Sequence, residues 1–164
     1  MIYIIIIISF LLEGIITNLI SLNSLLIPVF TITSFVITYP YFNKEKKYIF
    51  LLTSLSVGIC YDIVYTNSLF INTFSFIICS LIIILIHNFL SHRVYNVMLS
   101  NIFILILFRT CTYFLLIAFS NHMHFNKELL FKGIYSSLIL NIIYGLILYF
   151  ICDKLAKKLN IIKK

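Results

Sequence analysis

Three charged side chains lie inside segments of the sequence that are otherwise apolar, namely Glu13, Asp62 and Arg109. A charged group inside hydrocarbon costs about 2.5–3.5 kcal/mol on insertion scales, so it is retained where it has a partner, water or a function. Two carboxylates and one guanidinium can form ion pairs, relay protons or bind a polar ligand. These three residues are therefore the candidate functional site.

The composition of the chain is that of an integral membrane protein. Of its 164 residues 62% are hydrophobic, and its mean hydropathy is +1.12. Soluble domains contain about 45–50% hydrophobic residues. Apolar runs of about 20 residues, which span about 30 Å of hydrocarbon, alternate with short polar patches. These runs predict an all-α polytopic membrane protein, a single domain over residues 1–164 with a short basic tail over about 153–164.

Six transmembrane helices are predicted from the apolar runs. Their approximate ranges are 2–20, 25–39, 48–65, 69–90, 97–119 and 129–152. Pro28 falls in the first turn of the second helix, where proline is tolerated. Lys and Arg in the connections and the tail number nine on one side of the membrane and two on the other. The positive-inside rule then places both termini in the cytoplasm.

This topology places the three charged residues at similar depths. Helices one, three and five run outward, so at ~1.5 Å per residue Glu13 lies roughly 16 Å, Arg109 roughly 19 Å and Asp62 roughly 21 Å from the cytoplasmic side. We therefore predict a polar cluster in the bundle interior, in which Arg109 bridges both carboxylates through its planar fork of donors. Such a cluster can be a structural staple that fixes helix register. Alternatively, it is a proton or ion relay, or a site for a polar ligand or a partner side chain.

Small residues recur at helical spacing in two of the predicted helices. In the third helix, Ser54 and Gly58 lie on the same face as Asp62. The sixth helix carries a second stripe, spaced by four, which consists of Gly133, Ser137, Asn141 and Gly145. Small residues let neighbouring helices approach closely, so both stripes are predicted helix-packing faces.

Other chemistry has little support in the sequence. His122 and His124 are two residues apart in a predicted outer turn, and a solvated loop explains them better than a metal or haem site does. The four cysteines show no C-x-x-C spacing, and nucleophile and phosphate-binding motifs are absent. We expect no metal, no cofactor and no catalytic residue. The net charge of +7 comes from residues at segment ends, which favours contacts with membrane lipid over nucleic acid.

The stretch around Asp62 resembles the MreD family, the small multi-pass subunit of the bacterial rod-shape system. The resemblance lies in the run Gly58-Ile59-Cys60-Tyr61-Asp62, followed by Leu69 and Asn72, which is similar to the family's G-x-x-x-D signature, short turn and apolar helix. It covers about 20 residues; over the rest of the chain, the length, the spans and the basic C-terminal end agree in pattern.

The resemblance implies a non-enzymatic scaffold in the bacterial cytoplasmic membrane. Such a scaffold associates with the single-pass protein MreC and, through it, with MreB filaments, the glycosyltransferase RodA and a class-B penicillin-binding protein. Its role is to support peptidoglycan synthesis along the lateral wall during elongation.

The alternative function comes from the fold that the resemblance implies. The MreD fold is similar to that of the substrate-binding subunits of energy-coupling-factor vitamin transporters, which have six helices and a ligand pocket toward the outer face. Those subunits carry an A-x-x-x-A packing face in helix one, whereas residues 2–20 contain no alanine. The sequence therefore favours the scaffold over the transporter subunit. An intramembrane lipid enzyme, the third class, would need several clustered polar groups near a headgroup plane, and Asp62 is alone in its segment.

Overall fold

The structure, a computed structural model, describes residues 2–20, 27–42, 47–66, 70–89, 93–119 and 125–158. These residues form helices and short connections, with no strand among them, so the all-α prediction is confirmed. The helices are α1 (Ile2–Ile20), α2 (Phe30–Thr38), α3 (Lys47–Tyr61), α4 (Ile71–Phe89), α5 (Val94–Phe119) and α6 (Lys127–Lys158). A 3-10 turn follows α2 at Tyr39–Tyr41, and a π-helical turn follows α3 at Asp62–Thr66.

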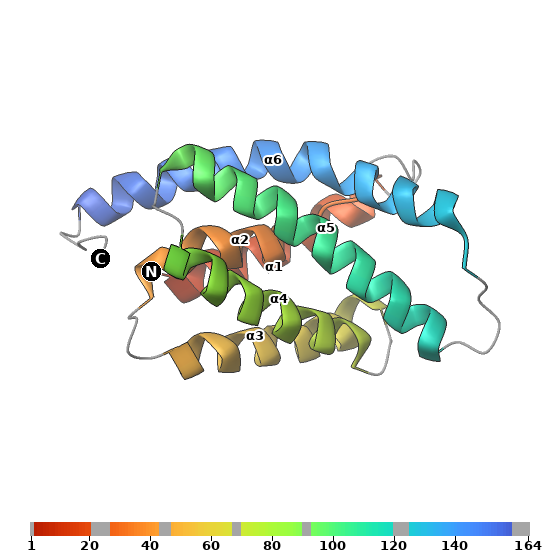
Figure 1. The fold of residues 1–164 in the computed structure, drawn as a ribbon. Coiled ribbons are helices and arrows are strands. Elements are labelled where there is room, and N and C mark those ends of the chain that lie inside the picture. The colour runs from red at the N-terminus through yellow and green to blue at the C-terminus, as the bar shows by residue number, and fades with distance from the viewer. Residues whose placement is uncertain are drawn as a thin grey trace.

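Five of the described helices are long and apolar enough to cross a membrane, namely α1, α3 with its π-helical turn, α4, α5 and α6. These helices are consistent with a membrane protein that has several potential spans. In Figure 1 the start of α1 and the end of α6 lie at the same end of the bundle, and so do the end of α4 and the start of α5.

The prediction of a spanning helix over residues 25–39 is wrong in its extent. Helix α2 has nine residues and is therefore ~14 Å long, about half of the hydrocarbon thickness. The cause is Pro28, which has no N–H and disfavours helical geometry in the residue before it. Residues 27–29 are accordingly not helical. The second segment is an irregular entry followed by a short helix.

This irregular entry is possible inside a membrane protein because α6 satisfies its backbone groups. The Ile27 N–H donates to the Ser136 carbonyl at 3.1 Å, and the Val29 N–H donates to Asn141 Oδ1 at 2.9 Å. Pro28 has no N–H to satisfy. The segment is therefore joined to α6 by hydrogen bonds of its backbone N–H groups that a continuous helix would not need.

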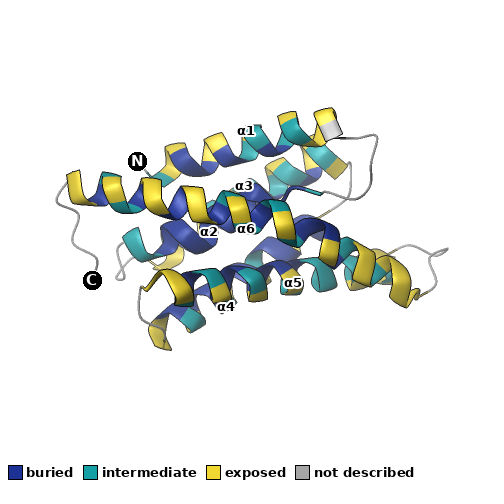
Figure 2. Ribbon diagram, turned by 90° about the horizontal axis from the view of Figure 1, so that it is seen from above, coloured by how far each residue is buried: buried dark blue, intermediate teal, exposed yellow. Residues whose placement is uncertain are grey.

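Helix α2 is the centre of the core. All nine of its residues are buried, and it packs against α1, α5 and α6. Figure 2 shows it in dark blue among helices that each expose one face. Phe35 of α2 meets Phe50 of α3 and Phe76 of α4 edge to face, with ring centroids 5.4 and 6.0 Å apart. The polar residues on α2 are therefore enclosed by aromatic packing and must bond within the protein.

The predicted basic tail over 153–164 begins as helix. Helix α6 runs through Lys158, over 32 residues or ~48 Å, which is longer than the hydrocarbon thickness. Asp153 pairs with Lys157 at 2.8 Å, one turn later, and cations favour the C-terminal end of a helix. The helix thus extends into the predicted tail as far as Lys158. Residues 159–164 lie outside the described residues, as do His122 and His124.

Candidate functional site

Asp62 caps the N-terminus of the next helix. Its Oδ1 accepts hydrogen bonds from the backbone N–H of Asn72 at 3.0 Å and from Asn72 Nδ2 at 2.9 Å. Its Oδ2 accepts from the backbone N–H of Thr73 at 2.8 Å and from the Thr73 hydroxyl at 2.6 Å. The carboxylate is only 4% exposed. It therefore satisfies two of the N–H groups that the first turn of any helix leaves without partners.

The cap is supplied from the π-helical turn after α3, and α4 has no oxygen-bearing residue of its own at its N-terminal boundary. The residue before α4 is Phe70, whose carbonyl accepts the first helical bond, from the N–H of Phe74. Ser, Thr, Asp or Asn is preferred at this position because a side-chain oxygen can accept from the first turn, and phenylalanine has no such oxygen. Phe70 also adopts a left-handed conformation, with φ 62°, which costs about 1–2 kcal/mol. The negative charge of Asp62 lies at the positive end of the α4 dipole.

Glu13 does the same for α2. Its Oε2 accepts from the backbone N–H of Thr31 at 2.9 Å and from the Thr31 hydroxyl at 2.5 Å, and its Oε1 accepts from the Tyr61 hydroxyl at 2.6 Å. Glu13 is 1% exposed. The residue before α2 is Val29, which makes no side-chain cap. Both acids are therefore caps that one helix supplies to another.

Arg109 does not bridge the two carboxylates, so the predicted arrangement of the polar cluster is wrong. Within the described residues its guanidinium forms no ion pair with Glu13 or Asp62 at 4.0 Å or less. Glu13 and Tyr61 are near enough to interact with Arg109 electrostatically. The physical reason is competition: helix N-termini offer each acid several aligned donors close by, so neither acid needs the guanidinium.

Arg109 instead lines two cavities. The larger has a volume of about 200 Å³ and lies between the π-helical turn, the start of α4 and α5. Its polar lining comes from Tyr61, Thr66, Asn72, Arg109 and Thr112, and its apolar lining comes from Ile71, Phe108 and Leu116. The smaller cavity lies between α5 and α6. Of these three charged residues, Arg109 rather than either acid is therefore the one that a ligand or a partner could contact.

Comparisons of the chain with protein-family models, curated proteins and solved structures find no match.

The small-residue face of α3 packs directly on α4. Ser54 donates to the Phe76 carbonyl at 3.0 Å and accepts from the Ser80 hydroxyl at 2.6 Å. A Cβ added to Gly58 would lie 2.8 Å from the Thr73 Cα, which is closer than real Cβ atoms approach. Gly58 therefore lets α4 approach at the point where Asp62 must reach its first turn.

The stripe on α6 has two different roles. Gly145 lies against Asn101, Thr33 and Ile37, as a packing glycine should. Asn141 accepts from the Val29 N–H and donates to the carbonyl of Ser137, which is itself fully buried. Gly133 was predicted to pack as well, but among the described residues it makes no such contact: no atom of a neighbouring element lies within 4 Å of an added Cβ. Gly133 instead lines the smaller cavity between α5 and α6.

We expect Gly58→Ala to destabilise the protein by about 1–3 kcal/mol, because its methyl group would press on the backbone of α4. Gly133→Ala is the matched control, since its methyl group meets nothing, and we expect its free energy of unfolding to stay within about 1 kcal/mol of the wild-type value. Unfolding in mixed detergent and SDS, followed by far-UV circular dichroism, measures both. Equal losses for the two variants would contradict the close contact at Gly58.

The sequence interpretation missed the donors of the site. Thr31, Tyr61, Asn72 and Thr73 complete the two caps, yet nothing marked them as a group. The available signal was local: Asn72-Thr73 begins four residues after the polar residues 66–68, and Thr31 lies three residues after Pro28, as residues of a first helical turn do. In the described part of the chain, no three His, Cys, Asp or Glu side chains are placed to hold a metal ion.

Proposed function

We propose that the protein is a non-enzymatic scaffold subunit of the bacterial cell-shape and elongation machinery. The observation that carries this proposal concerns Asp62, the acid of the G-x-x-x-D stretch, whose carboxylate is engaged in hydrogen bonds within its own chain. Its two oxygens accept five hydrogen bonds from its own chain, from Asn72, Thr73 and Thr66. An acid so occupied supports a fixed fold rather than turnover. The carboxylate of Glu13 is likewise engaged in hydrogen bonds within the chain. A fixed fold of this kind suits a scaffold.

The proposal assigns partners by the MreD resemblance. These are a single-pass MreC-like protein and, through it, MreB, RodA and a class-B penicillin-binding protein. The broad apolar faces of α1, α5 and α6 are compatible with membrane lipid and with helices of other chains, because large apolar side chains are exposed along each of them.

Depletion followed by microscopy tests the proposed function. In a rod-shaped host, loss of a shape scaffold should produce rounded cells within a few generations, and the wild-type gene should restore rods. Complementation with Asp153→Ala serves as the control for a folded variant, since its partner Lys157 is 78% exposed. Cells that remain rods without the protein would contradict the proposal.

We propose the topology with both termini in the cytoplasm and the chain in the cytoplasmic membrane. In a variant without the native cysteines, Asn121→Cys should react with a membrane-impermeant maleimide added to intact cells, because the 120–126 connection would face outward. Asn43→Cys should react only after the cells are broken, because its connection carries Lys44, Lys46 and Lys47. The reverse pattern would overturn the orientation.

A second candidate, the substrate-binding subunit of a vitamin transporter, is favoured by one observation. The 200 Å³ cavity combines a guanidinium and hydroxyl groups with apolar walls. Small-molecule sites usually measure about 300–1,000 Å³, so the cavity is small for a vitamin. A panel of water-soluble vitamins should leave the thermal stability of the purified protein unchanged if it is a scaffold, whereas a saturable shift with one vitamin would favour the transporter subunit.

A further inference from the structure

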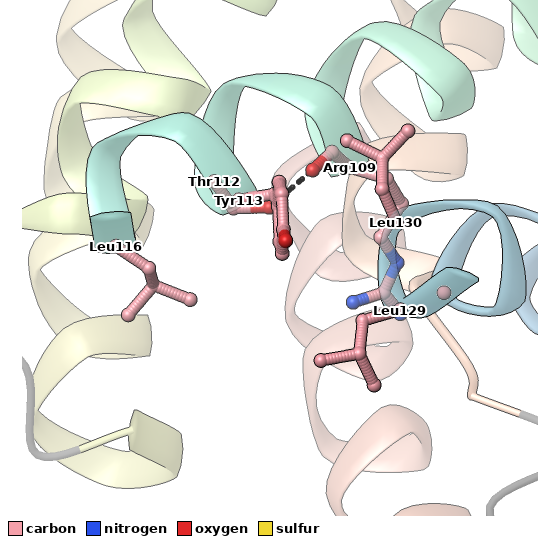
Figure 3. A pocket seen from close by; sticks show the side chains of 7 residues that line it. Arg109, Thr112, Tyr113, Leu116, Leu129 and Leu130 are labelled. Carbon is pink, nitrogen blue, oxygen red and sulfur yellow. Dashed lines mark hydrogen bonds between the residues drawn. The ribbon is translucent and has the colours of Figure 1, made fainter. Parts of the chain in front are cut away.

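The side chain of Arg109 lies in a groove on the side of the bundle. The groove has a volume of about 130 Å³ and lies between α5 and α6, and we call it the α5–α6 groove; it is lined by Arg109, Thr112, Tyr113, Leu116, Leu129, Leu130 and Gly133. Figure 3 shows the Arg109 side chain extending from α5 toward Leu129 and Leu130 of α6. Leu129 is 59% exposed, and Gly133 has open space where a side chain would be. The groove therefore combines a cation with apolar walls and room at Gly133.

The charge pattern of α6 places this groove at the level of the lipid headgroups. Residues 133–152 form a run of 20 residues without Asp, Glu, Lys or Arg, and a helical run of this length, ~30 Å, matches the hydrocarbon core. The two turns before this run carry Lys127, Glu128 and Lys132, all of them exposed. The α6 residues that line the groove belong to these two turns and to the first residue of the run. The groove therefore lies where the headgroup region meets the hydrocarbon.

The second cavity beside Arg109 places the guanidinium at the same end of the bundle. Arg109 shares that cavity with Thr66, the last residue of the π-helical turn, and with Asn72, the second residue of α4. The Arg109 backbone lies ten residues, or ~15 Å, before the end of α5. Long basic side chains cover such a distance in part, because their apolar stems lie along the protein and carry the charge toward the interface. A lipid phosphate can therefore approach the guanidinium from the side.

The hydroxyl groups that line the groove bond to the backbone. Thr112 donates to the carbonyls of Phe108 and Arg109, at 2.9 and 3.1 Å. The Tyr113 hydroxyl donates to the Asn126 carbonyl at 2.9 Å and accepts from the Asn126 N–H at 2.8 Å. Among the groups that line the groove, Arg109 is therefore the charged donor that an anion would bind.

The charges near the groove favour an anion. Glu13 interacts electrostatically with Arg109, but its oxygens accept from Thr31 and Tyr61, and within the described residues the guanidinium forms no ion pair at 4.0 Å or less. Glu13 therefore offsets part of the charge of Arg109 without using its N–H donors. The first two turns of α6 add two lysines and one glutamate. Three cations thus stand against two acids.

We propose that the α5–α6 groove binds the phosphate of an anionic membrane lipid. The guanidinium presents parallel N–H donors that match phosphate oxygens, and the acyl chain runs past Gly133 along the leucines of the groove into the hydrocarbon. A site that encloses a whole small molecule measures about 300–1,000 Å³, so this groove suits one end of a longer molecule. The inference goes beyond the proposed scaffold function and does not depend on it.

The test measures which lipid lies beside the groove. The chain contains no tryptophan, so a single Trp reports on one place. Leu129→Trp introduces it at the groove, and Phe131→Trp is the matched control, because it is exposed at a similar level but turned by ~200° around α6. Each protein is reconstituted in mixed phosphatidylcholine and phosphatidylglycerol vesicles, and bromine on the acyl chains of one lipid or the other quenches the fluorescence. We expect a preference of about 5-fold for phosphatidylglycerol in the Leu129→Trp protein and a clearly smaller one in the control.

Two further changes in the Leu129→Trp protein separate the guanidinium from the groove. Arg109→Gln should lower the preference to that of the Phe131→Trp control, and Arg109→Lys should retain part of it. Gly133→Leu should also lower it, because its side chain fills the groove. An added Cβ at Gly133 meets no neighbour, so this variant decides the test if Arg109→Gln fails to fold.

Four outcomes would each overturn the proposal. The first is an equal preference in the Leu129→Trp and Phe131→Trp proteins, and the second is a preference that survives Arg109→Gln or Gly133→Leu. The third is loss of the preference when inorganic phosphate is added at constant ionic strength, which would show that the site takes free phosphate. The fourth is the absence of quenching by either lipid, which would show that a second copy of the chain covers the groove.

Discussion

Asp62→Ala should reduce the free energy of unfolding by about 3–5 kcal/mol, the cost of removing one partner from a buried charged arrangement. The change leaves two backbone N–H groups of α4, the Thr73 hydroxyl and the Asn72 amide without their acceptor. Bulk water has little access to these donors in the native protein, because Asp62 is only 4% exposed. Unfolding in mixed detergent and SDS, followed by far-UV circular dichroism, gives the value.

The conservative variant separates charge from capping. Asp62→Asn keeps one acceptor oxygen but brings an NH₂ group toward other donors, so we expect a smaller loss of about 1–3 kcal/mol. Asp153→Ala removes an acid whose partner Lys157 is 78% exposed, and we expect a loss below about 1 kcal/mol. If Asp62→Ala costs no more than Asp153→Ala, Asp62 does not hold α4 in place.

Glu13→Ala should also cost about 3–5 kcal/mol, and its effect should be concentrated on α2. Three donors lose their acceptor, namely the Thr31 N–H, the Thr31 hydroxyl and the Tyr61 hydroxyl. Helix α2 is only nine residues long, and short helices depend on tertiary contacts for their stability. We expect α2 amides to exchange with deuterium faster while α4 amides keep their protection.

The two acid variants are controls for each other. Asp62→Ala should accelerate exchange in α4, and Glu13→Ala should accelerate it in α2, because each acid caps a different helix. Tyr61→Phe removes one of the donors to Glu13 and should cost only about 1 kcal/mol. Identical exchange patterns for the two acid variants would favour a single shared cluster over two separate caps.

The two caps explain how a membrane bundle accommodates helices that lack an N-cap side chain of their own. Val29 and Phe70 stand where an oxygen-bearing side chain is preferred, and both are apolar. An acid on the preceding helix then serves the first turn and the helix dipole together. Each costly intramembrane charge thereby links two helices that are adjacent in sequence order. Arg109 is not used in this way, and within the described residues its side chain lines two cavities instead.

The membrane class, the all-helical fold and the approximate ranges of five helices were determined by the sequence alone. Apolar runs long enough to cross hydrocarbon permit helices because each backbone group can bond within its own segment. The same runs identified Glu13, Asp62 and Arg109, since charge is rare in such a setting. Depth along a helix could also be counted, because the rise per residue is fixed.

Only the tertiary structure decided what the charges bond to. Depth leaves the rotation of each helix about its axis undetermined, so three residues at similar heights could equally form one cluster or face three directions. The break at Pro28 brought the N-terminus of α2 within reach of Glu13, and the turn before α4 brought Asn72 and Thr73 onto Asp62. Those donors are separated from their acids by 10–18 residues in the chain, and packing alone unites them.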